Sequence, residues 1–316
     1  MDMFIKFLVA AVLAGTPLLY GTLGEIISEK TGHLNLGVEG MMSIGACAGF
    51  MAGYYTDNFF FALAASFVAG LLSAMIYAVL TITFMANQNV TGLTLTIFGI
   101  GLSNFIGVLE LAKSESGTLK LPENITAQMR NINIPGLSDI PVVGELLFSY
   151  NLFVYLGVAI ALILGYYLHK TKVGLNVQAI GENPAAADAA GIPVTKLRYL
   201  NILLAGGICG IGGMYMSMVT TSGVWVHGCV SGYGWLAVAL VIFATWRPFR
   251  GMIVALIFGG LTIMRMYVSI PGLPAQIYDM LPYAATILVL VVTSMRSSRE
   301  HAQPKSCGLN YFREER

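Results

Sequence analysis

Long apolar runs separated by short polar stretches dominate the chain. A membrane-spanning helix needs about 20 mostly apolar residues, and nine runs approach or reach that length, at 7–24, 34–53, 60–84, 90–111, 150–168, 199–219, 234–246, 251–267 and 283–295. The runs 234–246 and 251–267 are short and are separated by Trp246, Arg247 and Pro248. We expect these two to be half-spans or a re-entrant hairpin, which is tolerated only where protein covers the backbone. The pattern predicts an all-α polytopic membrane protein with roughly 8–10 transmembrane helices.

Composition supports a membrane protein. Of 316 residues, 56% are hydrophobic and only 10% are charged, with a net charge of +1, whereas soluble domains carry about 25% charged residues. These values exclude a disordered chain, an ordinary cytosolic enzyme and a nucleic-acid binder built on basic patches. The four cysteines form no C-x-x-C pair, so we expect no zinc or redox site.

Lysine and arginine predict the orientation of the chain, because they concentrate in cytoplasmic loops. They flank the loop 170–198, mark 246–250 and crowd the tail 296–316. We therefore expect these three segments in the cytoplasm, and the N-terminus and the long polar segment 113–149 outside, as a folded cap or loop. The N-terminal run is interpreted as a first membrane helix because it lacks a small-residue cleavage site. Residues 1–316 are expected to form a single transmembrane domain.

Ionisable residues inside spans are costly and indicate function by default. Glu39 lies at the start of the second run, four residues after Asn35, so we expect the two side chains on one helix face. Glu39 could border a substrate route, or it could fix one helix against another through hydrogen bonds. Arg265, near the end of a short span, could reach the membrane surface or pair with Glu39 or Glu110.

Uncharged polar side chains cluster near the start of the fourth run. This group comprises Asn87, Gln88, Asn89, Thr91, Thr94, Thr96 and Asn104. Such donors and acceptors suit a neutral polar solute such as a sugar or a nucleoside, and they also serve as contacts between helices. A further group near the expected outer surface comprises Trp225, His227, Tyr233 and Trp235. Interfacial aromatic belts or a binding role would explain it.

The clearest local prediction is a short helix in the loop 170–198. Asn183 is a good N-cap and Pro184 suits the first helical position. Gly191 is expected to end the helix in a left-handed conformation, with Pro193 preventing its continuation. The helix would be about two turns, or roughly 10 Å, long, and needs a docking surface to be stable. That surface could be a partner protein, or the helix could simply connect two spans on the membrane face.

Several motifs in a fixed order carry a resemblance to a known family. They are the stretch Gly181–Ile192 followed by Lys196–Tyr199, the N-terminal stretch Leu23–Met42, the glycine-rich Ala205–Met214, and Ser231–Phe243 followed by Trp246–Pro248. Together they resemble permeases of bacterial ABC importers of the branched-chain amino acid/ribose superfamily, in its simple-sugar and nucleoside branch. The chain departs from that pattern at Ala244, where the family usually has glycine, and in the tail 313–316.

The resemblance implies how the protein works. The short helix and its flanks would couple to a cytoplasmic ABC ATPase subunit through Gly181, Glu182, Asn183, Pro184, Ala185, Ala186, Ala187, Asp188 and Gly191. Asn35, Glu39, Asn87, Asn89, Thr94 and Asn104 are the candidates for the substrate pathway. Further partners would be a second permease subunit, homologous or identical, an extracytoplasmic substrate-binding lipoprotein and membrane lipid. The substrate would be a nucleoside or a simple sugar, carried across the inner membrane.

The chain itself is not expected to be an enzyme. It contains no Gly-Lys dipeptide and hence no Walker A loop, so ATP and Mg²⁺ would bind to the partner ATPase and this chain would hold no cofactor or metal. One alternative is a secondary transporter driven by an ion gradient, which would need carboxylate-rich ion sites near mid-membrane. An intramembrane enzyme is a further alternative, but the expected loops, span ends and tail contain all the aspartates other than Asp2 and all four histidines.

Overall fold

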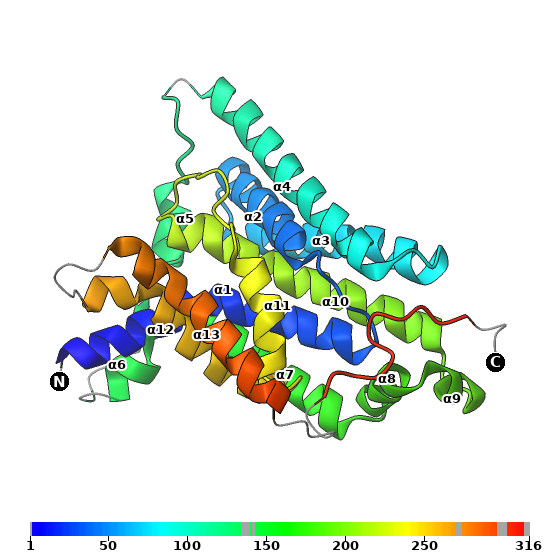
Figure 1. Cartoon of the computed structure of the whole chain (residues 1–316). Coiled ribbons are helices and arrows are strands. Elements are labelled where there is room, and N and C mark those ends of the chain that lie inside the picture. The colour runs from blue at the N-terminus through cyan, green and yellow to red at the C-terminus, as the bar shows by residue number, and fades with distance from the viewer. Residues whose placement is uncertain are drawn as a thin grey trace.

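The computed structural model describes residues 2–114, 116–133, 140, 143–268, 274–295 and 302–312. The long helices are α1 (Asp2–Lys30), α2 (Val38–Thr56), α3 (Phe59–Ala78), α4 (Gln88–Lys113), α7 (Leu152–Lys170), α10 (Val194–Tyr215), α12 (Pro248–Tyr267) and α13 (Ala275–Met295) (Figure 1). The shorter ones are α5 (Glu123–Gln128), α6 (Val143–Leu147), α8 (Lys172–Glu182), α9 (Pro184–Ala189) and α11 (Tyr233–Phe243). The π-helical turns η1 (Val79–Thr83) and η2 (Met216–Thr220) extend α3 and α10, and strands β1 (Ile132–Asn133) and β2 (Ser149–Tyr150) pair antiparallel.

The predicted all-α membrane architecture is confirmed. Each of the nine apolar runs falls on a helix. Among the described residues, six helical stretches are long and apolar enough to cross a membrane, namely Met3–Lys30, Phe59–Thr83, Gln88–Lys113, Leu152–Lys170, Val194–Thr220 and Pro248–Tyr267. Two shorter apolar helices, Tyr233–Phe243 and Ala275–Val291, add to these.

Side-chain oxygens fix where several helices begin. Asn58 accepts hydrogen bonds from the backbone amides of residues 60 and 61, and Asn87 and Asn151 each accept one from the amide three residues later. Thr171 does the same at the start of α8. These bonds satisfy amides that have no partner within the helix, so polar residues between apolar runs set the helix boundaries.

The central helix is α10, which packs against α1, α2 and α3. Its most apolar window is 83% buried, compared with 28–44% for the other five candidate spans. Backbone contacts at glycines make this burial possible. A Cβ placed on Gly213 would lie 1.8 Å from the Met42 carbonyl oxygen, and one on Gly210 would lie 2.4 Å from that of Ser66. Small residues let membrane helices approach this closely.

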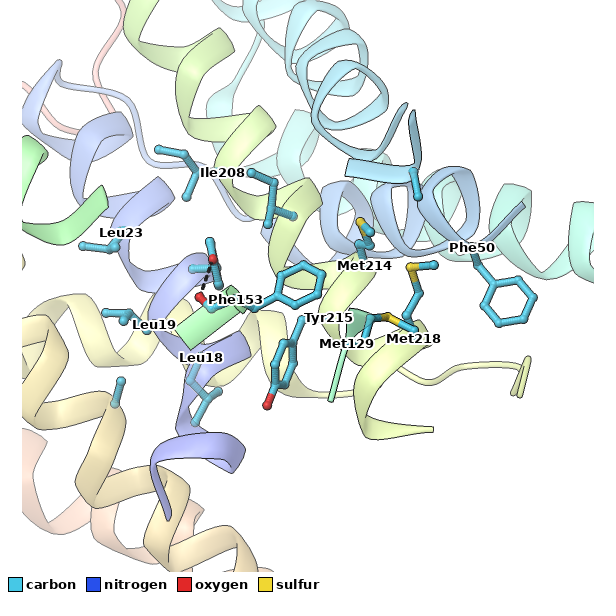
Figure 2. Packing of buried hydrophobic residues seen from close by; sticks show 14 of the residues in the cluster. Leu18, Leu19, Leu23, Phe50, Met129, Phe153, Ile208, Met214, Tyr215 and Met218 are labelled. Atoms are coloured by element: carbon cyan, nitrogen blue, oxygen red, sulfur yellow. Dashed lines mark hydrogen bonds between the residues drawn. The ribbon is translucent and has the colours of Figure 1, made fainter. Parts of the chain in front are cut away.

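Large side chains fill the space between α1, α7 and α10 (Figure 2). Leu18 and Leu23 of α1 are fully buried, and Phe153 of α7 packs edge-on against Tyr215 of α10 with ring centroids 5.5 Å apart. The Tyr20 hydroxyl donates a 2.7 Å hydrogen bond to the Phe153 carbonyl. The buried hydroxyl is therefore satisfied, and it ties α7 to α1.

The two ends of the helix bundle carry different segments (Figure 1). The segment after α4, with α5 and α6, lies at one end, and α8, α9 and the C-terminal tail lie at the other. The expected loop 113–149 is folded, but it contains the short helices α5 and α6, which the glycine and proline pattern did not predict. Ile125 of α5 is buried in the main core. Pro135, Gly136 and Pro141 of that pattern lie outside the described residues.

Three other local expectations need correction. The pair predicted as half-spans is one short helix, α11, and one full-length helix, α12, because Thr245 and Trp246 turn the chain with positive φ before Pro248 begins α12. Helix α13 starts at Ala275, so Asp279 lies in a helix, with Pro282 tolerated inside it. Helix α8 was not predicted at all.

Candidate functional site

The short helix α9 has the predicted design. Asn183 has an extended backbone, and its Oδ1 accepts a 3.0 Å hydrogen bond from the Ala186 amide. Pro184 occupies the first turn, and Gly191 adopts φ +81° directly after the helix. The Ile192 amide then donates to the Ala187 carbonyl at 3.0 Å. Capping at both ends makes α9 a defined helix of six residues.

One face of α9 packs against the protein and the other is exposed. Ala187 is 4% exposed and packs in a cluster with Ile180, Val194 and Leu197. Ala186 is exposed, as are Glu182 and Asn183. The Tyr311 hydroxyl of the tail donates a 3.0 Å hydrogen bond to Asp188. The exposed face thus offers small side chains to which another surface could approach closely.

Glu39 lies in the first turn of α2 and caps helix α11. Its Oε1 accepts a 2.7 Å hydrogen bond from the Gly232 amide, and its Oε2 accepts from the Gly234 amide at 2.8 Å and the Trp235 amide at 3.2 Å. These amides have no partner within α11, and the positive end of the helix dipole favours a carboxylate there. The side chain therefore fixes α2 against α11, one of the two roles considered from the sequence.

A small cavity borders Glu39. It has a volume of about 60 Å³, and its lining includes Ser43, Ser103, Asn104 and Ser231. Binding pockets for small molecules usually measure about 300–1,000 Å³, so this cavity is large enough for a few waters and too small for a nucleoside in this conformation. The structure brings two of the candidate pathway residues, Glu39 and Asn104, to one cavity.

The remaining pathway candidates lie elsewhere. Asn35 precedes α2 rather than lying in it, so it does not share a helix face with Glu39. Its Oδ1 accepts a 2.9 Å hydrogen bond from the Gly37 amide. Asn87 caps α4, whereas Asn89 and Thr94 are exposed on the outer side of that helix. The helical prediction failed because two turn residues, Leu36 and Gly37, precede α2.

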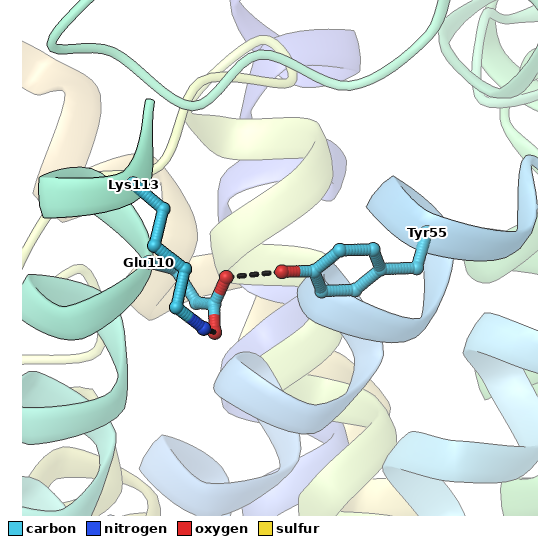
Figure 3. Close-up of polar contacts among 3 residues, drawn as sticks. All are labelled: Tyr55, Glu110 and Lys113. Atoms are coloured by element: carbon cyan, nitrogen blue, oxygen red, sulfur yellow. Dashed lines mark hydrogen bonds and ion pairs between the residues drawn. The ribbon is translucent and has the colours of Figure 1, made fainter. Parts of the chain in front are cut away.

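Arg265 pairs with neither predicted carboxylate. Its side chain is exposed near the end of α12. Glu39 is occupied by backbone amides, and Glu110 pairs with Lys113 at 2.7 Å and accepts a hydrogen bond from the Tyr55 hydroxyl (Figure 3). The predicted pairing of Arg265 with Glu39 or Glu110 is therefore wrong, and its predicted reach to the membrane surface stays a prediction. The contact between Tyr55 and Glu110 instead joins the ends of α2 and α4.

A cluster of buried ionisable side chains was not predicted from the sequence. Glu25, Glu29, His33 and Arg198 are each at most 3% exposed. Glu25 accepts a 2.8 Å hydrogen bond from the Asn35 amide, and Glu29 accepts one of 2.6 Å from the indole of Trp246. Burial, and then the charge of Arg198, hold the pKa of His33 well below its usual value.

The sequence held a signal for this cluster. Glu25 and Glu29 are four residues apart in an otherwise apolar helix, which places both carboxylates on one face. Arg198 was counted only as a charge that sets orientation. Among the described residues, no group of three or more histidine, cysteine, aspartate or glutamate side chains could hold a metal ion.

The six long apolar helices in the described part of the chain define a multi-pass membrane protein. Residues 7–290 match the family model described as branched-chain amino acid transport system / permease component, and the chain belongs to this family. It is thus the permease subunit of an ABC importer, a class whose permeases lack ATPase activity and work with ATPase and binding-protein partners.

Relatives align over nearly the whole chain. TsgC13 of Haloferax volcanii, assigned as a glucose ABC transporter permease, is 35% identical, covering 96% of this chain and 97% of its own. The guanosine ABC transporter permease NupQ of Bacillus subtilis is 33% identical, covering 97% and 96%, and the nucleoside ABC transporter permease NupC of Lactococcus lactis is 31% identical, covering 98% of each chain. A solved metal-chelate type ABC transporter in an inward-facing conformation has 13% identity, a TM-score of 0.47 and coverage of 92% and 85%, and no conclusion rests on it.

Proposed function

We propose that this permease carries a nucleoside or a simple sugar across the cytoplasmic membrane, with a nucleoside as the first choice. The names of the aligned relatives, which include guanosine, nucleoside and glucose transporters, support this substrate class. The cavity beside Glu39 must widen to admit such a solute, but its three serines and Asn104 already offer the uncharged donors and acceptors that a neutral polar solute needs. Membership of the ABC importer permease family replaces the ion-gradient alternative.

In this proposal, the segment 181–191 docks into a cytoplasmic ATPase that binds ATP and Mg²⁺. The single observation that carries it is α9, a capped helix with its alanine face exposed at Ala186 and its opposite face held at Ala187. Six residues form too short a helix to be stable alone. The caps at both ends and the packing of Ala187 keep α9 folded before a partner binds, so the partner does not have to supply the free energy of folding it.

The proposed orientation places α8, α9 and the tail in the cytoplasm and the segment 113–149 outside. Lys170, Lys172 and Lys196 lie beside α8 and α9, and basic residues mark cytoplasmic loops. An extracytoplasmic binding lipoprotein would then deliver solute at the end that carries α5 and α6. A second permease subunit completes the proposed complex.

A bulky side chain on the open face of α9 tests the coupling role. Ala186→Trp should abolish uptake and binding of the ATPase while the permease still purifies as a folded protein. The matched control for ATPase binding is Ala127→Trp, which should leave that binding intact, since Ala127 is also an exposed alanine of a short helix, α5, at the opposite end of the bundle. Normal uptake by Ala186→Trp would refute the proposal.

The substrate class is tested with the reconstituted complex, by screening nucleosides and sugars for stimulation of ATP hydrolysis. Asn104→Ala should weaken that stimulation for the true substrate, whereas Asn89→Ala, on the exposed side of the same helix, should not. Equal effects of the two substitutions would remove Asn104 from the pathway.

A further inference from the structure

The C-terminal tail, residues 302–312, is bound along the end of the bundle that carries α8 and α9 (Figure 1). We call these residues the strap. Pro304 and Ser306 of the strap are buried. The Ser306 amide and hydroxyl donate hydrogen bonds of 2.9 and 2.6 Å to the carbonyl of Gly181, near the end of α8. The strap is therefore fastened just before α9 begins.

Two side chains of the strap reach the last turn of α1. Gln303 donates a 3.2 Å hydrogen bond to Oε2 of Glu29, the same oxygen that accepts from Trp246, and the Cys307 thiol lies 3.9 Å from it. Burial, together with the negative charges of Glu29 and Glu25, raises the pKa of the Cys307 thiol. The strap thus covers the buried ionisable cluster at Glu29.

The far end of the strap holds the start of α4. The Asn310 amide group donates a 2.5 Å hydrogen bond to the Met85 carbonyl, and Gln88 of α4 donates one of 3.3 Å to the Leu309 carbonyl. Gln88 also accepts a 2.9 Å hydrogen bond from the Leu34 amide. The end of the strap therefore binds the segment before α4 at Met85 and α4 itself at Gln88. Gln88 in turn binds the segment between α1 and α2 at Leu34.

Tyr311 connects the strap to α9 itself. Its hydroxyl donates to Asp188, its ring packs against the cluster that buries Ala187, and the guanidinium of Arg198 lies 6.0 Å from the ring centroid. Helix α9 packs mainly on α8 and α10, whereas α4 packs on α2, α3 and η1. The strap touches both sets of helices.

We propose that the strap is a positioning segment for transport, which fastens α9 to the helix bundle so that a push on α9 moves the bundle. The inference rests on the proposed docking of α9 with an ATPase. Helix α9 lies between two breaks in the helical backbone, the extended Asn183 and the left-handed Gly191. A force applied at α9 would bend these breaks first unless a second attachment held the helix. Tyr311, Asn310 and Ser306 supply that attachment.

The test compares solute uptake with ATP hydrolysis in the full complex reconstituted with its ATPase and binding protein. Tyr311→Phe keeps the ring but loses the bond to Asp188, and Asn310→Ala loses the bond to Met85. Each should lower the number of solute molecules moved per ATP, by at most the factor of about two to twelve that one hydrogen bond contributes to the equilibrium between attached and detached α9. The pair together should lower it further. Lys305→Ala is the matched control, because Lys305 is an exposed residue of the same strap.

The ratio separates positioning from a purely structural role. Loss of folded protein lowers uptake and hydrolysis equally and leaves the ratio unchanged, whereas a loosened α9 wastes ATP and lowers it. An unchanged ratio in Tyr311→Phe and Asn310→Ala, or an equal fall in Lys305→Ala, overturns the inference. If Ala186→Trp still blocks uptake in that case, the proposed function stands without the strap. If Ala186→Trp is silent, the proposed function itself fails.

Discussion

Replacement of Asn183 by alanine should weaken the contact with the ATPase by a predictable amount. The substitution removes the side-chain oxygen that accepts a 3.0 Å hydrogen bond from the Ala186 amide. Losing an N-cap of this kind costs about 1 kcal/mol, which is about fivefold in the equilibrium between formed and frayed α9. The apparent dissociation constant of a partner that binds only the formed helix rises by up to the same factor. The packing of Ala187 keeps part of the helix formed without its cap, so the cap energy predicts a rise of about twofold to fivefold in the dissociation constant.

The measurement is a titration of purified ATPase subunit against the permease in lipid nanodiscs. Asn183→Asp and Asn183→Ser serve as matched controls, because both side chains cap helices as well as asparagine does. Neither keeps the side-chain NH2 group, so a partner that accepted a hydrogen bond from the Asn183 amide would be weakened by all three substitutions.

Two results would refute this reasoning. If the alanine variant binds the ATPase as tightly as the original chain, then either α9 does not need its cap or it is not the docking element. If Asp and Ser variants bind as weakly as the alanine variant, the role of Asn183 is direct contact and not capping.

Three further predictions follow from the buried contacts. Gly213→Ala should destabilise the purified protein by about 1–3 kcal/mol, seen as a lower thermal unfolding midpoint, or prevent folding, because overpacking a tight contact is destabilising. Gly101→Ala is the control and should leave the midpoint unchanged, because a Cβ at Gly101 meets open space. Glu39→Gln should cost about 1–3 kcal/mol, since one α11 amide loses its acceptor, and unchanged thermal stability would count against the capping role. The pKa of His33 is lowered, so the unfolded chain binds a proton that the folded chain does not, and stability should fall as the pH drops below about 6.5. His33→Gln should reduce that fall by up to about 1.4 kcal/mol per pH unit, and an identical pH profile would contradict it.

Most of the helical architecture could be predicted from the sequence, because apolar run length and helix caps are local properties. Asn183, Pro184 and Gly191 specify α9 within nine residues of chain, and the structure confirms all three roles. Helix α8 was missed because its sequence, with two glycines among eleven residues, lacks a long apolar run. Its start depends on Thr171, a capping signal that is weak without structural context.

Contacts between distant segments could not be predicted. Asn35 and Glu39 are four residues apart, but the turn between them places one before α2 and the other in it. Glu39 meets amides almost 200 residues away, and Glu29 meets Trp246 and the strap. Spacing along one chain segment carries no information on such partners. The strap itself had no recognisable motif, and its place follows only from its hydrogen bonds.

The distribution of close backbone contacts shows why α9 must be fastened if it is to act at a distance. A Cβ on Gly15 of α1 would lie 2.3 Å from the Ala255 carbonyl oxygen of α12, and one on Gly40 of α2 would lie 2.4 Å from that of Leu95 in α4. Together with the contacts of Gly210 and Gly213, they bring the backbones of α1 and α12, of α2 and α4, and of α10 with α2 and α3 into direct contact. Such surfaces resist sliding past one another, because packed interiors transmit strain rather than deform.

In our proposal, a bundle joined in this way moves as a rigid body, and the translocation path opens by rotation of the subunit against a second permease subunit. The energy that drives this rotation enters, in our proposal, through a six-residue helix with a break in the backbone on each side. Because the backbone can bend at Asn183 and at Gly191, α9 transmits force to the bundle only if other contacts hold it in place. The hydrogen bonds of Ser306, Asn310 and Tyr311 provide bracing at three points, so the efficiency of coupling, and not the stability of the bundle, should depend most on the tail.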